Sequence, residues 1–144
     1  MLVSHILKSK SDDGVVMLPP GTTVAKLAEV LSARRIGAVV ISRDGRVVDG
    51  IVSERDVVRE IGRRGPACLP DRVESLMTAR VTTCARNDSA DEVLAIMTEG
   101  RFRHLPVVEN GQMVGLISIG DVVKARLSEL AMENHALEGM IKGF

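Results

Sequence analysis

Apolar and polar residues alternate along this chain in an order that occurs twice. Val24, Leu27 and Leu31 are spaced three and four residues apart, which is typical of one face of a helix, and Ala38-Val39-Val40-Ile41 is a short apolar run that indicates a strand. Val93, Ile96 and Met97, followed by Leu105-Pro106-Val107-Val108, repeat this succession. Thr23 and Ser89 stand where the two helices begin and are suited to cap them.

Each copy continues with a hairpin and a second helix. Asp44-Gly45 and Asn110-Gly111 predict hairpin turns, because Asn and Gly tolerate the positive φ that tight turns need. The predicted leading strands are residues 15–17 and 81–83, the second hairpin strands are residues 46–52 and 112–117, and the second helices open at Ser53 and Ser118.

The two copies can be aligned directly. Residues 19–45 align with 85–111 at an offset of 66, and residues 50–60 align with 115–125 at an offset of 65. Matched positions include the glycines of both hairpins and both Ser-x-x-Asp segments. The sequence therefore predicts an internal duplication of a β-α-β-β-α unit.

These patterns place the first repeat at residues 1–66 and the second at 67–144, with a linker at residues 63–73. Each repeat is expected to form a three-stranded sheet with its helices on one face. The last helix is predicted to run from Ser118 to about Ile141, which exceeds what its own repeat needs. Its extension is expected to pack on the other repeat or on a second subunit through one stripe, formed by Val123, Leu127, Leu130, Leu137 and Ile141.

Composition excludes several functions. Lys and Arg number 19, as do Asp and Glu, and the only aromatic residues are two Phe, so neither a basic face nor a stacking platform for nucleic acid is expected. Cys68 and Cys84 have no metal-binding or CxxC spacing, and no metal site is predicted. The sequence shows no secretory signal and no apolar run of about 20 residues, so a cytoplasmic protein without a membrane partner is expected.

Two motifs carry a resemblance to a known family. The hairpins end in Gly50-Ile51-Val52-Ser53-Glu54-Arg55-Asp56 and Gly115-Leu116-Ile117-Ser118-Ile119-Gly120-Asp121, and Arg103-His104-Leu105-Pro106 precedes the second hairpin turn. The chain resembles a cystathionine-β-synthase (CBS) domain pair, or Bateman module, over essentially its whole length. The resemblance implies an α/β (α+β) fold of two repeats packed as a pseudo-twofold pair, in a disc-shaped homodimer. It leaves no catalytic or transport domain in this chain to be regulated.

The resemblance further implies two sites for adenosine-containing ligands, namely AMP, ADP, ATP, NAD(H) or S-adenosylmethionine, in clefts between the repeats. The first-repeat site would use Lys8, Val16, Gly37, Ala38, Ser53, Arg55 and Asp56. The second-repeat site would use Thr78, Thr83, Arg103, His104, Leu105, Pro106, Ser118 and Asp121. Occupancy would regulate an unidentified partner protein.

The residue chemistry is consistent with this. An ionised Asp accepts hydrogen bonds from both hydroxyls of a cis-diol, and free amides at a helix N-terminus attract phosphate. Arg103 and His104 add donors that the first repeat, with Gly37-Ala38, lacks. We therefore expect the second site to bind a mononucleotide more tightly than the first.

Other interpretations of these residues remain open at this stage. Ser-x-x-Asp is also an ordinary helix cap, and Arg103 and His104 could be solvated or structural. Cys84 is expected to be a small buried hydrophobe rather than a redox group. A scaffold that has lost its ligand would use the same fold. An enzyme is disfavoured because the sequence has no catalytic triad order, metal cluster or phosphate loop.

Overall fold

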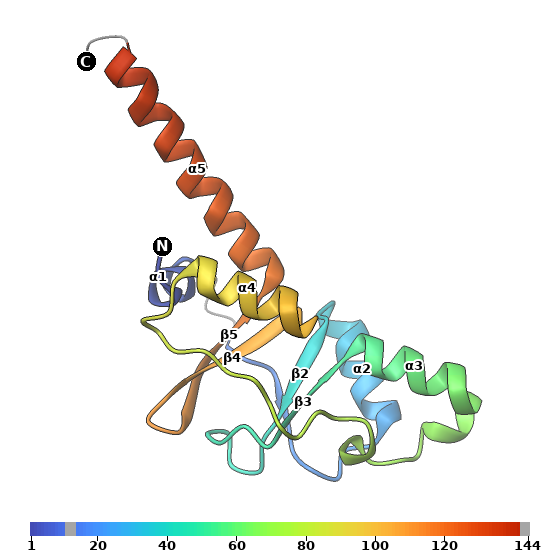
Figure 1. Ribbon diagram of the computed structural model, residues 1–144. Coiled ribbons are helices and arrows are strands. Elements are labelled where there is room, and N and C mark those ends of the chain that lie inside the picture. The colour runs from blue at the N-terminus through green and yellow to red at the C-terminus, as the bar shows by residue number, and fades with distance from the viewer. Residues whose placement is uncertain (11–13, 142–144) are drawn as a thin grey trace. The chain divides into compact units, whose positions relative to one another are not determined.

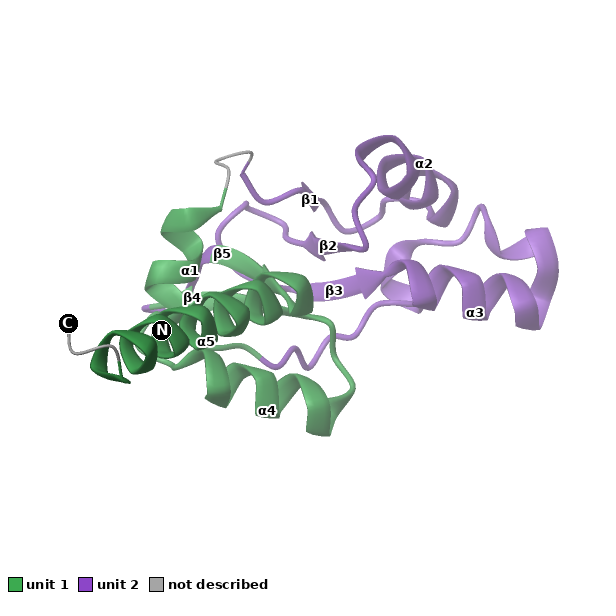
Figure 2. Ribbon diagram, turned by 90° about the horizontal axis from the view of Figure 1, so that it is seen from above, with its two compact units in different colours: residues 1–12, 83–109, 115–144 green, residues 13–82, 110–114 purple. Residues whose placement is uncertain are grey.

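The computed structural model describes residues 1–10 and 14–141 of the 144. Helices and short strands alternate along the chain, which confirms the α+β prediction (Figure 1). The chain divides into two units (Figure 2). Unit 1 comprises Met1–Asp12, Thr83–Glu109 and Gly115–Phe144, and unit 2 comprises Asp13–Thr82 and Asn110–Val114.

Unit 2 contains a three-stranded sheet in the order β1-β2-β3, with β1 parallel and β3 antiparallel to β2. Both helices cover the same face, because Val39, Ile41 and Val52 pack with residues of both. The strands are β1 (Met17–Leu18), β2 (Ala38–Ile41) and β3 (Gly50–Ser53), and the helices are α2 (Val24–Arg34) and α3 (Glu54–Arg64).

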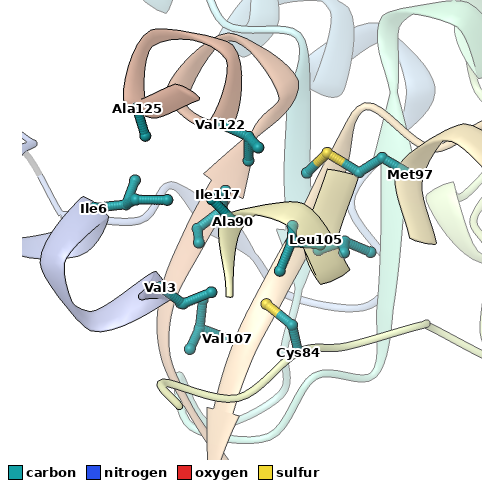
Figure 3. Packing of buried hydrophobic residues seen from close by; sticks show 11 residues of the cluster. Val3, Ile6, Cys84, Ala90, Met97, Leu105, Val107, Ile117, Val122 and Ala125 are labelled. Carbon is teal, nitrogen blue, oxygen red and sulfur yellow. The ribbon is translucent and has the colours of Figure 1, made fainter. Parts of the chain in front are cut away.

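Unit 1 repeats this plan with fewer strands and more helix. The hairpin of β4 and β5 is joined by a single parallel bridge from Cys84 to Val107 in place of a leading strand. Its core is shown in Figure 3, where Val3 and Ile6 lie beside Ala90, Ile117 and Val122. Its elements are α1 (Val3–Ser9), α4 (Ala90–Gly100), β4 (His104–Glu109), α5 (Ile119–Ile141) and, from Gly115 on, β5 (Gln112–Ser118), whose first three residues are assigned to unit 2.

The predicted helix caps are confirmed. Thr23 Oγ1 accepts the Lys26 amide at 3.2 Å, and Ser89 Oγ accepts the Glu92 amide at 3.1 Å. The two-residue turn is also confirmed at Asn110-Gly111, where both residues have positive φ (52° and 77°).

The predicted second strand at residues 46–52 is wrong at its start, because β3 begins only at Gly50. Asp44 Oδ1 accepts the amides of Arg46 and Val47 at 2.8 and 2.9 Å, and Asp49 Oδ2 accepts the Arg43 amide at 2.8 Å. These carboxylates hold the backbone as a loop, so Asp44-Gly45 marks a turn within a longer connection.

Two predicted leading strands also shift. In the first repeat the strand is β1 (Met17–Leu18) rather than residues 15–17. In the second, residues 81–83 form no strand, and Cys84 alone pairs, its amide donating to Pro106 O at 3.0 Å. The predicted linker, residues 63–73, contains the short 3₁₀ helix Gly65–Cys68, and a second one, Val73–Ser75, begins at its last residue. Cys68 and Val73 are buried in these helices.

The segment preceding each repeat folds with the opposite repeat, which the pattern of the sequence does not predict. In unit 1, Val3 N donates to Asp88 O and Ala90 N donates to Met1 O, each at 2.9 Å. In unit 2, Val73 N donates to Thr22 O and Val24 N to Asp71 O, each at 2.8 Å. Residues 1–12 therefore belong to unit 1 and residues 67–82 to unit 2, whereas sequence order assigned them to the first and second repeats.

Candidate functional site

The first Ser-x-x-Asp segment forms a closed turn at the start of α3. Asp56 Oδ2 accepts the Ser53 amide at 2.8 Å and the Ser53 hydroxyl at 3.1 Å, and the Asp56 amide donates back to Ser53 Oγ at 3.4 Å. This reciprocal arrangement is a capping box. The Asp56 side chain keeps 20% of its surface exposed, and its other oxygen, Oδ1, lies 3.5 Å from Arg59 Nη1.

The second segment forms the same turn at the start of α5. Asp121 Oδ2 accepts the Ser118 amide at 2.9 Å, and the Asp121 amide donates to Ser118 Oγ at 3.1 Å. The Asp121 side chain is 23% exposed. The Ser118 amide and Lys10 Nζ both approach Oδ2 rather than Oδ1 of this carboxylate.

In each unit one backbone hydrogen bond ties the start of the helix that carries the aspartate to the residue just before the first hairpin strand. The Glu54 amide donates to Gly37 O at 2.9 Å in unit 2, and the Ile119 amide donates to Arg103 O at 2.8 Å in unit 1. The four residues occupy matching positions of the two repeats. Gly37 thus lies next to the turn of Asp56, and Arg103 next to the turn of Asp121.

A lysine that the sequence analysis did not select completes the second turn. Lys10 Nζ lies 2.8 Å from Asp121 Oδ2 and also donates to Leu116 O at 2.8 Å. The contact depends on α1 folding with the second repeat, since Lys10 directly follows that helix. The sequence shows only that a basic residue is present in the N-terminal segment. Because Lys10 and Asp121 are 111 residues apart along the chain, their contact could not be predicted from it.

Two opposing effects act on the Asp121 carboxyl. Burial alone would raise its pKa, but the hydrogen bond and charge of Lys10, with the Ser118 amide and hydroxyl, outweigh burial and hold the pKa below its ordinary value. The carboxylate is therefore ionised at neutral pH and acts only as an acceptor.

The remaining residues of the first predicted site are divided between the units. Val16 is half-buried and accepts the Val40 amide at 3.4 Å, and Ala38 is buried in β2 opposite Ser53. Arg55 is exposed on α3, where Arg59 rather than Arg55 approaches Asp56. Lys8 belongs to α1 of unit 1.

The second predicted site is divided in the same way. Arg103 and Thr83 are exposed, His104 is half-buried at the start of β4, and Leu105 and Pro106 are buried in that strand. Thr78 belongs to unit 2, where its amide and carbonyl pair with Ile51 at 2.9 and 3.0 Å. Leu105 and Pro106 thus offer backbone, whereas Arg103 offers a charged side chain.

The described residues give no sign of other chemistry. No three His, Cys, Asp or Glu side chains among them gather where a metal ion could bind. Within the same residues, no helix has the length and apolarity to cross a membrane. Cys84 is buried, as expected of a small hydrophobe, and burial raises the pKa of its thiol to about 12.

Comparison with known proteins adds a family. The CBS domain family matches residues 3–63 and 73–128. The mitochondrial CBS domain-containing protein CBSX3 of Arabidopsis thaliana is 30% identical over 148 residues, covering 98% of this chain and 72% of CBSX3. The crystal structure of the CBS-domain containing protein ATU1752 from Agrobacterium tumefaciens is 45% identical, with a TM-score of 0.83, over 88% of this chain and 99% of that one. The CBS domain protein PAE2072 from Pyrobaculum aerophilum, complexed with AMP, is 27% identical, with a TM-score of 0.76, over 92% and 99%.

Proposed function

The chain belongs to the CBS domain family, and on this premise we propose that it is a non-catalytic regulatory module that binds an adenosine-containing ligand. The observation that carries the proposal is the Ser-Asp turn, built twice with the same hydrogen bonds at the start of α3 and α5. A cap alone needs only one carboxylate oxygen. At Asp121 the Ser118 amide and Lys10 both contact one oxygen, Oδ2, and the side chain is ionised and partly exposed.

The ribose of the ligand would bind at this carboxylate. A cis-diol supplies two hydroxyl donors, and Asp121 Oδ1 can accept at least one of them with charge-assisted strength. Arg103, held next to the turn by its own carbonyl, would supply the positive charge for a phosphate. The adenine would lie along the backbone near Leu105 and Pro106.

Ligand identity is proposed as a class. AMP is favoured first, because the Pyrobaculum aerophilum relative was solved with AMP, and ADP, ATP, NAD(H) and S-adenosylmethionine share its adenosine group. The second repeat would bind a mononucleotide more tightly than the first, since Gly37-Ala38 replaces Arg103-His104 there. We further propose a cytoplasmic homodimer that passes ligand occupancy to a partner protein as an energy or redox signal. Such signalling requires the ligand to bind two arrangements with different affinity.

The test starts from the absorbance of the purified protein. Without Trp or Tyr the chain absorbs very little above 250 nm, so a co-purified nucleotide gives a clear band near 260 nm, and NADH adds one near 340 nm. Mass spectrometry of an acid extract identifies it. Stripped protein is then titrated with AMP, ATP, NADH and S-adenosylmethionine by calorimetry.

The matched variants are the double change Asp56→Asn with Asp121→Asn, and Glu99→Gln on the exposed end of α4 as the control. We expect the double variant to lose binding by about 100-fold or more, because it removes two charge-assisted acceptors, and the control to bind as the parent does. Failure of every adenosine ligand to bind the parent protein would favour a protein-interaction scaffold instead.

A further inference from the structure

The second half of α5 presents an exposed apolar stripe. Figure 1 shows α5 continuing past α1 and α4, the helices of unit 1 that pack against its first half. Val122 and Ala125 are buried in that packing. The stripe lies on another face of the helix, and its residues are Val123 (43% exposed), Leu127 (63%), Leu130 (44%), Leu137 (55%) and Ile141 (85%).

The spacing of the stripe is that of a coiled coil rather than of a helix facing a globular core. With Asn134 included, the steps from Val123 to Ile141 are four, three, four, three and four residues. This assigns positions a to Leu127, Asn134 and Ile141, and positions d to Val123, Leu130 and Leu137. A strict alternation of three and four keeps one seam facing a second helix, because its period of 3.5 matches a supercoiled pair.

We propose that residues 123–141 of α5 pair with the same residues of a second copy of this chain, as an antiparallel two-stranded coiled coil. The stripe is symmetric about residue 132, so an antiparallel pair centred there loses no layer. Leu127 then faces Leu137 of the second copy, and Leu130 faces Asn134. The seam would extend over about 27 Å, since a helix rises 1.5 Å per residue.

The charges beside the stripe select the antiparallel orientation. Lys124 and Glu138 occupy e positions and Glu133 a g position, and all three side chains are exposed. Antiparallel pairing gives two attractive pairs, because Lys124 of each copy lies beside Glu138 of the other. It gives one repulsive pair, where the two Glu133 side chains approach each other near the centre. Parallel pairing would place Glu133 beside Glu138 twice and give no attractive pair.

Asn134 keeps this association moderate and in register. A polar residue at an a position lowers the stability of a coiled coil and penalises slipped alignments. Opposite Leu130 it gains no apolar contact, so Asn134→Leu is expected to tighten the dimer.

The experiment is sedimentation of the full chain over a concentration series, with far-UV circular dichroism to verify helix content. Leu127→Ser with Leu137→Ser is expected to weaken dimerisation by about 100-fold, because it places hydroxyls in facing core layers. Met132→Ser is the control: Met132 is an equally exposed apolar residue of α5 (68%) that lies off the stripe, and the dimer should persist. A monomeric parent protein, or a Leu127→Ser, Leu137→Ser variant that dimerises as the parent does, would overturn the proposal.

A charge reversal tests the orientation. In the antiparallel pair Glu138→Lys faces Lys124 of the second copy and should weaken dimerisation about tenfold at low salt, and adding Lys124→Glu should restore it. Tighter association of Glu138→Lys would instead indicate parallel pairing and overturn the antiparallel assignment. Nucleotide titration of the same variants should be unchanged, so failure here is separate from failure of the proposed ligand site.

Discussion

Units 1 and 2 build the same Ser-Asp turn and complete it with different neighbours. In unit 2 the carboxylate of Asp56 is approached by Arg59, one turn further along the same helix. In unit 1 the carboxylate of Asp121 binds Lys10, which comes from a segment more than a hundred residues away. The turn is thus a property of each repeat, whereas its electrostatic partner depends on which segment folds against it.

The segments that fold against each repeat, residues 1–10 in unit 1 and 67–82 in unit 2, also bind matching backbone carbonyls in different ways. In unit 2 the carbonyl of Ile51 accepts the Thr78 amide at 2.9 Å. In unit 1 the matching carbonyl, that of Leu116, accepts Lys10 Nζ at 2.8 Å. A main-chain donor is fixed by pairing, but a lysine side chain can leave, so the second turn has a neighbour that a ligand can displace or recruit.

The largest expected difference between the units is in nucleotide affinity. Asp121→Asn should reduce the affinity of the tighter AMP site by about 100-fold, and Asp56→Asn should reduce only the weaker binding, by about tenfold. The reason is that Arg103 accompanies Asp121, whereas the first repeat has Gly37 at that position. Calorimetric titration of the stripped single variants measures both values.

The outcome decides whether the turns are functionally distinct. Equal losses for AMP in both variants would mean that Arg103 adds nothing and that the two sites are equivalent. Glu99→Gln, which leaves both turns intact, again serves as the reference for stability and folding.

A smaller difference between the units is expected in the loss of stability when a matching glycine, Gly50 or Gly115, is replaced by alanine, because each lies against one of these segments. A Cβ added at Gly50 would collide with Met77 Sδ and approach Met77 Cγ to 3.0 Å, whereas at Gly115 it would meet the terminal Leu7 Cδ2 at 2.7 Å. Gly50→Ala should lower the free energy of unfolding by about 2 kcal/mol and Gly115→Ala by about 1 kcal/mol, because a terminal methyl group moves aside more easily.

Urea unfolding followed by far-UV circular dichroism measures these losses, since the chain has no Trp or Tyr to report by fluorescence. Gly62→Ala is the control: it lies in α3 with open space around its Cβ position and should gain up to about 1 kcal/mol. If Gly115→Ala proves the more damaging variant, α1 is held against the second repeat more rigidly than Met77 is held in unit 2.

Local features of the fold were accessible from the sequence because neighbouring residues determine them. The caps at Thr23 and Ser89 and the turn at Asn110-Gly111 depend on side chains within three residues, and all are confirmed. The loop before β3 was not predicted from the sequence, because it forms where the Asp44 and Asp49 carboxylates accept hydrogen bonds from backbone amides that a strand would have used.

The site was accessible only in part. Its Ser-Asp turns follow from spacing along one helix, but Lys10 depends on the folding of α1 with unit 1. That placement rests on hydrogen bonds between residues 1–3 and 88–90, which no periodicity indicates. Lys8 was assigned to the first-repeat site by its position relative to the family, whereas the lysine that contacts an aspartate is Lys10, and that aspartate is Asp121 of the second repeat.

The smallest expected difference concerns stability and pH. Lys10→Met should lower the free energy of unfolding at pH 7 by about 1 kcal/mol, and Arg59→Met by a few tenths at most, because the Arg59 contact is longer and largely exposed. The folded-state pKa of Asp121 is lowered, so its contribution is present above the unfolded-state pKa and disappears as the pH falls through the folded-state value. Parent and Lys10→Met should therefore differ at pH 7 and converge in acid, whereas the Arg59→Met curve should follow that of the parent throughout. A gap between parent and Lys10→Met that persisted once Asp121 is protonated in the folded protein would show that Lys10 stabilises unit 1 through its bond to the Leu116 carbonyl, and that the charge of Asp121 contributes little to holding α1 in place.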